Sequence, residues 1–212
     1  MDKINALCFY ETWCLFVSKE IIKKERLSLW MDDLQWTNNT IGIKASDKKY
    51  SPFGNFWKGK HPGWEYRKED ALVDLSIYRP EYLNDVMKLS PGGIIKNKPL
   101  GEKILNKYPV FYDILVEHEN NTTRAFEEMY KLTWYRASLK VLITYNWDEE
   151  EDDDYHHVIQ TLSENFQKII HGANIKNPET NTEYLLIVGQ KKADNNIIWD
   201  KFIYTSPELN IN

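Results

Sequence analysis

The stretch "DILVEHEN", Asp113 to Asn120, is an apolar run that ends in two carboxylates with a histidine between them. An apolar run bounded by polar residues is typical of a buried strand, and side chains on a strand alternate between its two faces. Glu117 and Glu119 are therefore expected to point the same way. Like charges at that spacing repel each other and are costly to desolvate, so the pair requires water, cationic side chains or a metal ion.

The segments around this strand predict an α/β protein with a mixed central sheet flanked by helices. Residues 37–64 are rich in turn formers and are expected to be mainly loop, with one short strand at most. Before the strand described above, the expected elements in chain order are one or two helices within residues 4–34, a strand in "EDALVDLSIYR" and a short helix before Pro91. After it we expect a helix in "NTTRAFEEMYKLTWYRAS", capped by Thr122 or Thr123, and then a strand in "LKVLITYN". The last expected elements are a helix from about Tyr155 to Ile170, which Gly172 ends, and a hairpin of "YLLIVGQKK" and "IIWDKFIYTS" around "ADNN".

The length and composition predict one folded domain. The chain has 212 residues, of which 42% are hydrophobic, and its 8 Trp, 13 Tyr and 8 Phe are typical of a packed core. We expect a single domain over residues 1–212, with an N-terminal helical part at about 4–36 and a core at about 64–206. The spacing of Cys8 and Cys14 fits neither a redox motif nor a zinc site, so both are expected to be reduced thiols in the core.

A cytoplasmic location without a membrane partner is expected. No apolar run approaches the roughly 18 residues that span a bilayer. The opening "MDKINALCFYETW" also lacks the basic segment and apolar region of a secretion signal.

Charge is distributed unevenly along the chain, whose net charge of -5 argues mildly against a protein that coats nucleic acid. The stretch "YSPFGNFWKGKHPGWEYRK", Tyr50 to Lys68, is the best candidate for a nucleic-acid surface, because cations contact phosphates while rings stack on splayed bases. The alternative is that its rings cover a hydrophobic edge. The cations expected to bind nucleic acid are Lys58, Lys60, Arg67 and Lys68.

An acidic run, Asp148 to Asp154, is expected to be an exposed loop because seven adjacent like charges repel. The alternative is that it faces a protein partner or mimics DNA.

A third carboxylate, Asp74, stands among apolar neighbours in "ALVDLSIY". Two adjacent strands that each present carboxylates at one end would place Asp74, Glu117 and Glu119 around a common point. Oxygen ligands of this kind suit Mg²⁺ or Mn²⁺. The alternative is that these acids are edge charges paired with Lys or Arg.

The succession "RKEDALVDLSIY", "FYDILVEHEN", "TRAFEEMYKLTWYRAS" and "LKVLITYN" resembles the core of the PD-(D/E)XK nuclease superfamily, whose fold is restriction endonuclease-like. The resemblance covers roughly Leu15 to Tyr145 and is expected to continue to the end of the sequence. In that superfamily a helix precedes strands that carry an Asp and then a (D/E)-x-K motif, and a helix and another strand follow. By this resemblance Asp74 takes the place of the first metal-binding acid and Glu117 that of the second. Glu119 occupies the position usually held by Lys.

The departure at Glu119 bears on activity, because a carboxylate cannot supply the positive charge of that Lys. Some members of the restriction-enzyme type use Glu-x-Glu, so the change is compatible with catalysis. Lys131 and Lys140 are candidate substitutes, and their alternative role is that of ordinary surface or strand-end cations. The first helix of the superfamily often adds an acid, for which Glu20 is the candidate. His118 alternates to the opposite face and is expected to be packed or hydrogen-bonded rather than catalytic.

The resemblance implies a Mg²⁺- or Mn²⁺-dependent nuclease that hydrolyses DNA phosphodiester bonds, with Asp74, Glu117 and Glu119 as metal ligands and Lys131 as a further catalytic residue. A metal ion held there would activate a water for in-line attack and neutralise charge on the phosphate. The alternative function is a catalytically silent protein of the same fold that binds a protein or nucleic-acid partner. An accessory role with a partner at residues 148–154, and a homodimer, are also compatible with the sequence.

Overall fold

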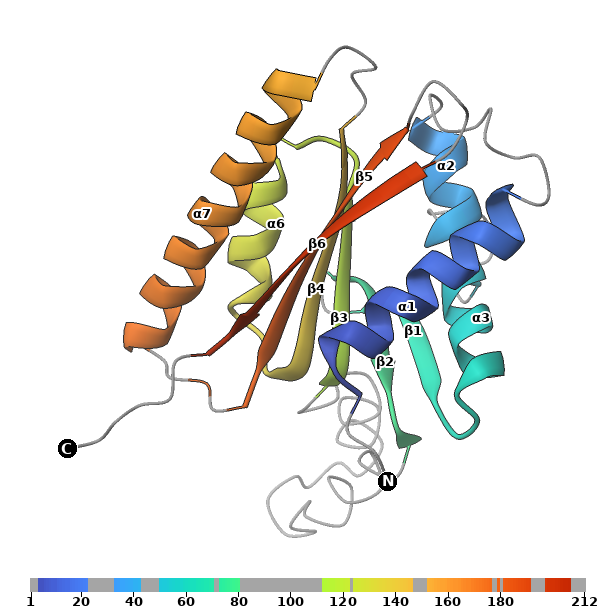
Figure 1. The fold of residues 1–212 in the computed structure, drawn as a ribbon. Coiled ribbons are helices and arrows are strands. Elements are labelled where there is room, and N and C mark those ends of the chain that lie inside the picture. Colours follow the sequence, from blue (N-terminus) through green and yellow to red (C-terminus); the bar gives the residue numbers. More distant parts are fainter. Residues whose placement is uncertain are drawn as a thin grey trace, which may run out of the picture.

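The chain forms a six-stranded mixed sheet with helices on both faces (Figure 1). A computed structural model describes residues 4–22, 33–42, 50–70, 73–80, 112–122, 124–146, 152–176, 179, 181–191 and 197–206. The elements are α1 (Ala6–Phe16), the π-helical η1 (Val17–Ile22), α2 (Asp33–Thr40), α3 (Pro52–Lys60), β1 (Glu65–Asp70), β2 (Val73–Tyr78), β3 (Tyr112–Glu119), α6 (Ala125–Leu132), β4 (Ala137–Asn146), α7 (Asp152–Lys176), β5 (Glu183–Lys191) and β6 (Ile197–Thr205). The expected α/β class with a mixed sheet is confirmed.

The strands lie side by side in chain order, from β1 to β6. β1, β2 and β3 are successively antiparallel, as are β5 and β6, so the expected C-terminal hairpin is confirmed. β3, β4 and β5 are parallel. Parallel neighbours need a crossover connection, and α6 and α7 supply the two that are required here. Because crossovers share one handedness, both helices lie on the same face of the sheet.

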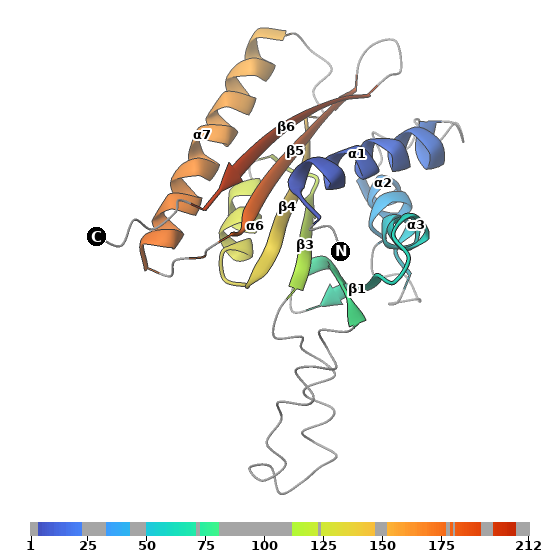
Figure 2. The ribbon, with the colours of Figure 1, turned by 60° about the horizontal axis from the view of Figure 1, so that its bottom comes forward.

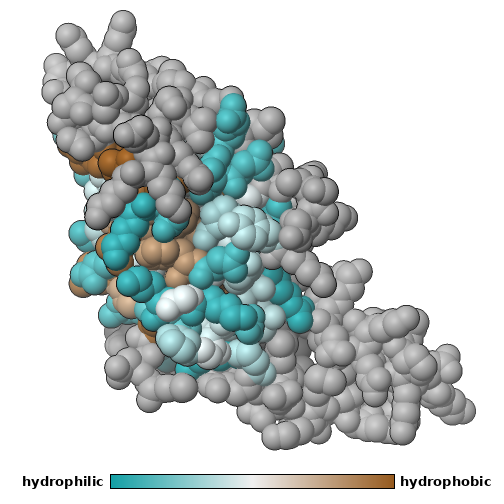
Figure 3. Space-filling view, turned by 90° about the vertical axis from the view of Figure 1, so that its right-hand side faces the viewer, coloured by the Kyte–Doolittle hydropathy of each residue, from teal (hydrophilic) through white to brown (hydrophobic). Residues whose placement is uncertain are grey.

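The sheet separates two cores. Figures 1 and 2 show α6 and α7 over one face and α1, α2 and α3 over the other. Alternation along β3 divides its apolar side chains accordingly: Ile114 and Val116 pack under α1 to α3, whereas Leu115 packs under α6 and α7. On the side of the molecule formed by the first three helices, the described surface is mostly hydrophilic (Figure 3).

Helix α3 corrects the expectation of a mainly irregular segment at residues 37–64. Ser51 caps the helix, since its hydroxyl accepts a hydrogen bond of 3.0 Å from the Gly54 N–H, and Pro52 occupies the first turn. Phe53 and Trp57, four residues apart, are buried in the core. A Cβ at Gly54 would lie 2.7 Å from the Tyr66 ring, so the close packing of α3 on β1 requires glycine there. The Ser-Pro cap and the aromatic spacing outweigh the local turn formers.

Strand β1 was not anticipated as an element distinct from β2. Its sequence, "EYRKED", is almost entirely charged, which is typical of an edge strand that must not pair with another chain. Backbone pairing with β2 holds it in place despite this weak sequence signal.

Helix α7 is longer than expected at both ends. It begins at Asp152, so the last three residues of the acidic run are helical rather than a loop, while residues 148–151 lie outside the described part. Acidic residues in a first turn suit the helix dipole. The helix also continues through Gly172, because a glycine costs an exposed helix only about 1 kcal/mol. Beyond Gly172, the Asn174 side chain donates a hydrogen bond of 2.9 Å to the carbonyl of Ile170, one helical turn earlier.

Helix α6 begins without the side-chain cap that the sequence predicted. Its N-cap is Arg124, which makes no capping hydrogen bond, so the predicted cap at Thr122 or Thr123 is wrong. Within the described residues, no helix is both long and apolar enough to cross a membrane. The expected helix before Pro91 lies outside the described residues.

Candidate active site on β2, β3 and α6

Asp74 of β2 and Glu117 of β3 lie side by side. The antiparallel register pairs Leu75 with Val116, and its next step places Asp74 opposite Glu117. The two carboxyl groups share a hydrogen bond, and Asp74 Oδ2 also accepts one of 2.8 Å from the His118 backbone N–H. Glu117 is 1% exposed. The structure therefore brings together the two acids that strand alternation predicted on one face, while their role as metal ligands stays a prediction.

A lysine and a third acid reach this pair from α6. Lys131 Nζ lies 2.8 Å from Glu117 Oε1, and it also forms an ion pair with Glu128, three residues earlier on the helix. The Lys131 side chain is 23% exposed, so it extends from the surface to the buried Glu117. We call Asp74, Glu117, Glu128 and Lys131 the acidic cluster. It holds three carboxyl groups and one ammonium.

Burial and mutual repulsion dominate the electrostatics of the acidic cluster. Burial, followed by the charge of Asp74, raises the pKa of Glu117 to about 9 despite Lys131. Burial also raises the pKa of Asp74, against the His118 N–H and Lys131, which lower it. Burial alone would lower the pKa of Lys131, but its bonds to Glu117 and Glu128 outweigh this and raise it. Without a further cation, Asp74 and Glu117 are expected to share a proton at neutral pH.

Glu119 lies two residues beyond Glu117, roughly 7 Å along the strand. Its Oε1 accepts a hydrogen bond of 2.8 Å from the Asn121 N–H. Burial raises its pKa, whereas this bond and Arg124 lower it. No three His, Cys, Asp or Glu side chains of the described chain are grouped so as to hold a metal ion. Glu119 thus does not complete a three-ligand set, although sequence alternation placed it on the same strand face as Glu117.

His118 is packed and hydrogen-bonded on the opposite face, as alternation along β3 predicted. Its Nε2 shares a hydrogen bond of 2.6 Å with the Tyr145 hydroxyl and lies 3.3 Å from Thr40 Oγ1. Burial lowers the pKa of His118 to about 3, so the ring is neutral. The sheet separates this imidazole from the acidic cluster. Glu20 lies in η1, which continues α1 on the side of the sheet opposite α6.

Lys140, the other candidate for the missing lysine, belongs to a separate site. Its ammonium is fully buried and lies 2.8 and 2.6 Å from the two oxygens of Glu179. The Tyr184 hydroxyl donates to the same carboxylate over 2.8 Å. Lys131 is therefore the lysine that reaches the candidate site, and Lys140 is a structural cation.

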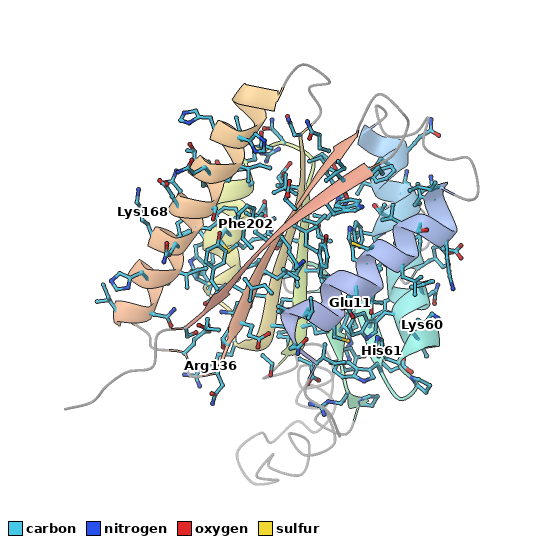
Figure 4. The ribbon with its side chains drawn as sticks, in the orientation of Figure 1. Glu11, Lys60, His61, Arg136, Lys168 and Phe202 are labelled. Atoms are coloured by element: carbon cyan, nitrogen blue, oxygen red, sulfur yellow. The ribbon has the colours of Figure 1, made fainter. Side chains whose placement is uncertain are left out.

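The cations predicted to bind nucleic acid have intramolecular partners or are buried. Lys58 is exposed and pairs with Glu65 at 2.6 Å, and Lys60 lies 5.9 Å from the Phe56 ring centroid. Lys68 is 8% exposed, so it adds little to a cationic surface. Lys60 is the last residue of α3, across the sheet from Lys168 of α7 (Figure 4).

Arg67 is the member of this group that lies on the face of the acidic cluster, since it pairs with Ser76, two residues from Asp74. It stacks on Tyr78 and donates a hydrogen bond of 3.2 Å to its hydroxyl. Binding of nucleic acid by these four residues stays a prediction.

Glu128 was not singled out from the sequence. Its signal was present: it stands three residues before Lys131 on a segment expected to be helical, a spacing at which charged side chains meet. The sequence does not show that this pair faces Glu117, because that depends on how α6 packs on the sheet.

Comparison of the chain with known protein families, with curated proteins and with solved structures finds no match. The superfamily resemblance seen in the sequence therefore stays a prediction.

Proposed function

We propose that this protein is a metal-dependent nuclease that hydrolyses phosphodiester bonds of DNA, with Asp74 and Glu117 as its metal ligands. The observation that carries the proposal is the contact between these two carboxyl groups on neighbouring strands, one of them 1% exposed. The buried Glu117 and the partly buried Asp74 are held against each other, with a single lysine for compensation. Such an arrangement is costly for stability alone and is typical of a functional site.

The chemistry of the donor groups fits Mg²⁺ or Mn²⁺. Both ions prefer oxygen ligands, and Mg²⁺ is commonly bound by one or two carboxylates together with waters and substrate phosphates. Two carboxylates are therefore sufficient, and a third protein ligand is not required. When bound, the ion would acidify a water and neutralise charge on the phosphate oxygens.

The side chains around the pair have distinct roles in the proposal. Lys131 supplies the positive charge that Glu119 cannot, and its contact with Glu117 aims the ammonium at the site. Glu119, with its raised pKa, is suited to accept a proton from the attacking water. Glu128 positions Lys131 through their ion pair.

The element order also supports the proposal. Among the described residues, helix α3 is followed by strand β1, the strand of Asp74, the strand of Glu117, helix α6 and the parallel strand β4, and the superfamily resemblance implies a helix, strands that carry the acids, a second helix and a further strand. DNA is accordingly the proposed partner. A homodimer and a protein partner at residues 148–154 stay predictions.

The test is cleavage of DNA, both duplex and single-stranded, by the full chain with Mg²⁺ or Mn²⁺, together with calorimetry of metal binding. Asp74→Ala and Glu117→Ala are each expected to reduce cleavage by about 10³-fold or more, because the metal site contributes several kcal/mol to transition-state stabilisation. Circular dichroism checks that both variants fold.

Asp113→Asn is the matched control. Asp113 is buried on the same strand and the same face as Glu117, but its partner is Arg79, whose Nη2 lies 2.6 Å away. This variant is expected to lose stability but keep its cleavage rate per folded molecule. A wild-type protein that neither cleaves DNA nor binds these metals contradicts the proposal and favours the silent binding protein. Full activity in Asp74→Ala shows that the wrong acids were chosen.

A further inference from the structure

Two aromatic rings are exposed in contact with each other at the C-terminal end of α6. Tyr130 is 56% and Trp134 is 62% exposed, and their ring centroids lie 5.4 Å apart in an edge-to-face arrangement. Single exposed apolar residues are normal on protein surfaces. Two large rings in contact, each with a polar group at its edge, are typical of an interaction site.

The backbone fixes the position of this ring pair. The Trp134 N–H donates a hydrogen bond of 3.0 Å to the Lys131 carbonyl, and the Thr133 N–H and hydroxyl both donate to the Tyr130 carbonyl. The turn that carries Trp134 is thus tied to the last turn of the helix. A surface held in its binding conformation loses little entropy when a ligand stacks on it.

Lys131 connects the ring pair to the acidic cluster. Lys131, which pairs with Glu117, directly follows Tyr130 in the chain, and its carbonyl is the acceptor for Trp134. Exposed cations stand at both ends of the helix: Arg124 precedes it, and Arg136 follows the rings. Arg136 lies at the lower end of the sheet in Figure 4, where β4 begins. Glu127 is an exposed anion on the same helix.

We propose that Tyr130 and Trp134 form a stacking platform for an unpaired base, so that the substrate is single-stranded nucleic acid. This inference rests on the proposed nuclease function, because it places a strand beside the acidic cluster. Two exposed rings flanked by Arg124 and Arg136 match a strand whose bases stack while its phosphates pair with arginine. In an intact duplex each base is stacked between its neighbours, so exposed rings on the surface of α6 cannot stack on it. This favours a single strand as the ligand.

The test measures binding of a fluorescein-labelled oligothymidylate by anisotropy, with EDTA present so that no cleavage is needed. Wild type is expected to bind this single strand more tightly than a duplex of the same length. The double variant Tyr130→Ala/Trp134→Ala is expected to lose affinity by about fivefold or more, as base–aromatic stacking contributes roughly that much per base. Trp134→Phe, which keeps a ring, should retain most of the affinity.

Further variants distinguish base stacking from damage to α6 and from self-association. Glu127→Gln removes an anion from the same helix surface and is expected to raise affinity, so a loss here would indicate general damage to α6 and overturn the assignment. Unchanged binding by the double alanine variant, confirmed as folded by circular dichroism, also overturns it. The assignment is also overturned if the double alanine variant sediments as a monomer where wild type sediments as a dimer, while oligonucleotide binding stays constant. The rings would then contact a second copy of the protein.

The nuclease proposal and the stacking-platform proposal can be contradicted separately. If the protein binds the oligonucleotide through the rings but cleaves no DNA, the nuclease proposal is wrong and the stacking platform is supported. If cleavage depends on Asp74 but neither cleavage nor binding depends on the rings, the stacking platform is wrong and the nuclease proposal is supported.

Discussion

Lys131 and Lys140 reach carboxylates on the same face of the sheet, yet their surroundings differ in charge balance. Lys140 and Glu179 form a matched pair, completed by the Tyr184 hydroxyl. Lys131 instead faces Glu117 and Glu128, with Asp74 hydrogen-bonded behind Glu117. The first group is one cation and one anion, whereas the acidic cluster has more carboxyl groups than cations.

The pKa shifts follow this difference. Burial lowers the pKa of Lys140 and outweighs Glu179, while the pKa of Lys131 is raised by two acids. Glu117 compensates by holding a proton, and burial with Asp74 raises its pKa to about 9. A buried ion pair that is balanced needs nothing further. One with surplus carboxylates can take up a proton or a metal ion, which is why we assign function to the acidic cluster and structure to the Lys140 pair.

The largest loss of stability expected from a single substitution is at the balanced pair. Lys140→Met leaves Glu179 buried without its cation and is expected to lower the free energy of unfolding by about 3–5 kcal/mol. Urea denaturation measures this. The double variant Lys140→Met/Glu179→Gln should recover most of the loss, and a single variant as stable as wild type would show that the pair carries no such penalty.

The second prediction is that metal binding at the acidic cluster stabilises the folded protein. At Mg²⁺ or Mn²⁺ concentrations of about 100 times the dissociation constant, the free energy of unfolding is expected to rise by about 2.7 kcal/mol. Thermal unfolding with and without the ion provides the measurement, and Asp74→Ala is the control that should not respond. An equal increase in both proteins would place the bound ion elsewhere.

The pH dependence of the metal-free protein should distinguish Glu117 from the carboxylate of a balanced pair. Its pKa is about 9 in the folded state and 4.5 in the unfolded reference, so the folded state binds the extra proton between these values. The contribution of Glu117 to the free energy of unfolding is therefore fully present below about pH 4.5. It falls as the pH rises toward 9, by up to about 1.4 kcal/mol per pH unit. Glu117→Gln should remove this slope, and an unchanged slope in that variant would attribute it to another group.

The smallest effect is expected at the exposed pair of Lys58 and Glu65, whose side chains are 48% and 41% exposed. Solvent and salt screen such a pair. Lys58→Ala should leave the thermal midpoint unchanged within experimental error. A clear decrease in the thermal midpoint would mean that exposure and charge balance do not determine how much each ion pair contributes to stability.

Much of the candidate site was predictable from local sequence. Alternation in "ALVDLSIY" and "DILVEHEN" put Asp74 on one face of its strand and Glu117 with Glu119 on one face of the next, and the same alternation separated His118 from them. This works because side-chain direction on a strand depends only on backbone geometry. Helix α3 and strand β1 were harder to foresee, since one is held by a cap and aromatic packing and the other by pairing with β2.

The sequence by itself determined the α/β class and the strand faces, because these follow from the periodicity of apolar side chains, and it contained two candidate lysines. Only the tertiary structure decided that Lys131 reaches Glu117 and Lys140 reaches Glu179. Both of these ion pairs join residues that are distant in sequence, so they depend on strand register and on how α6 packs on the sheet. Neither is encoded in local spacing, and a register shift of one residue would turn the same acids to the other face.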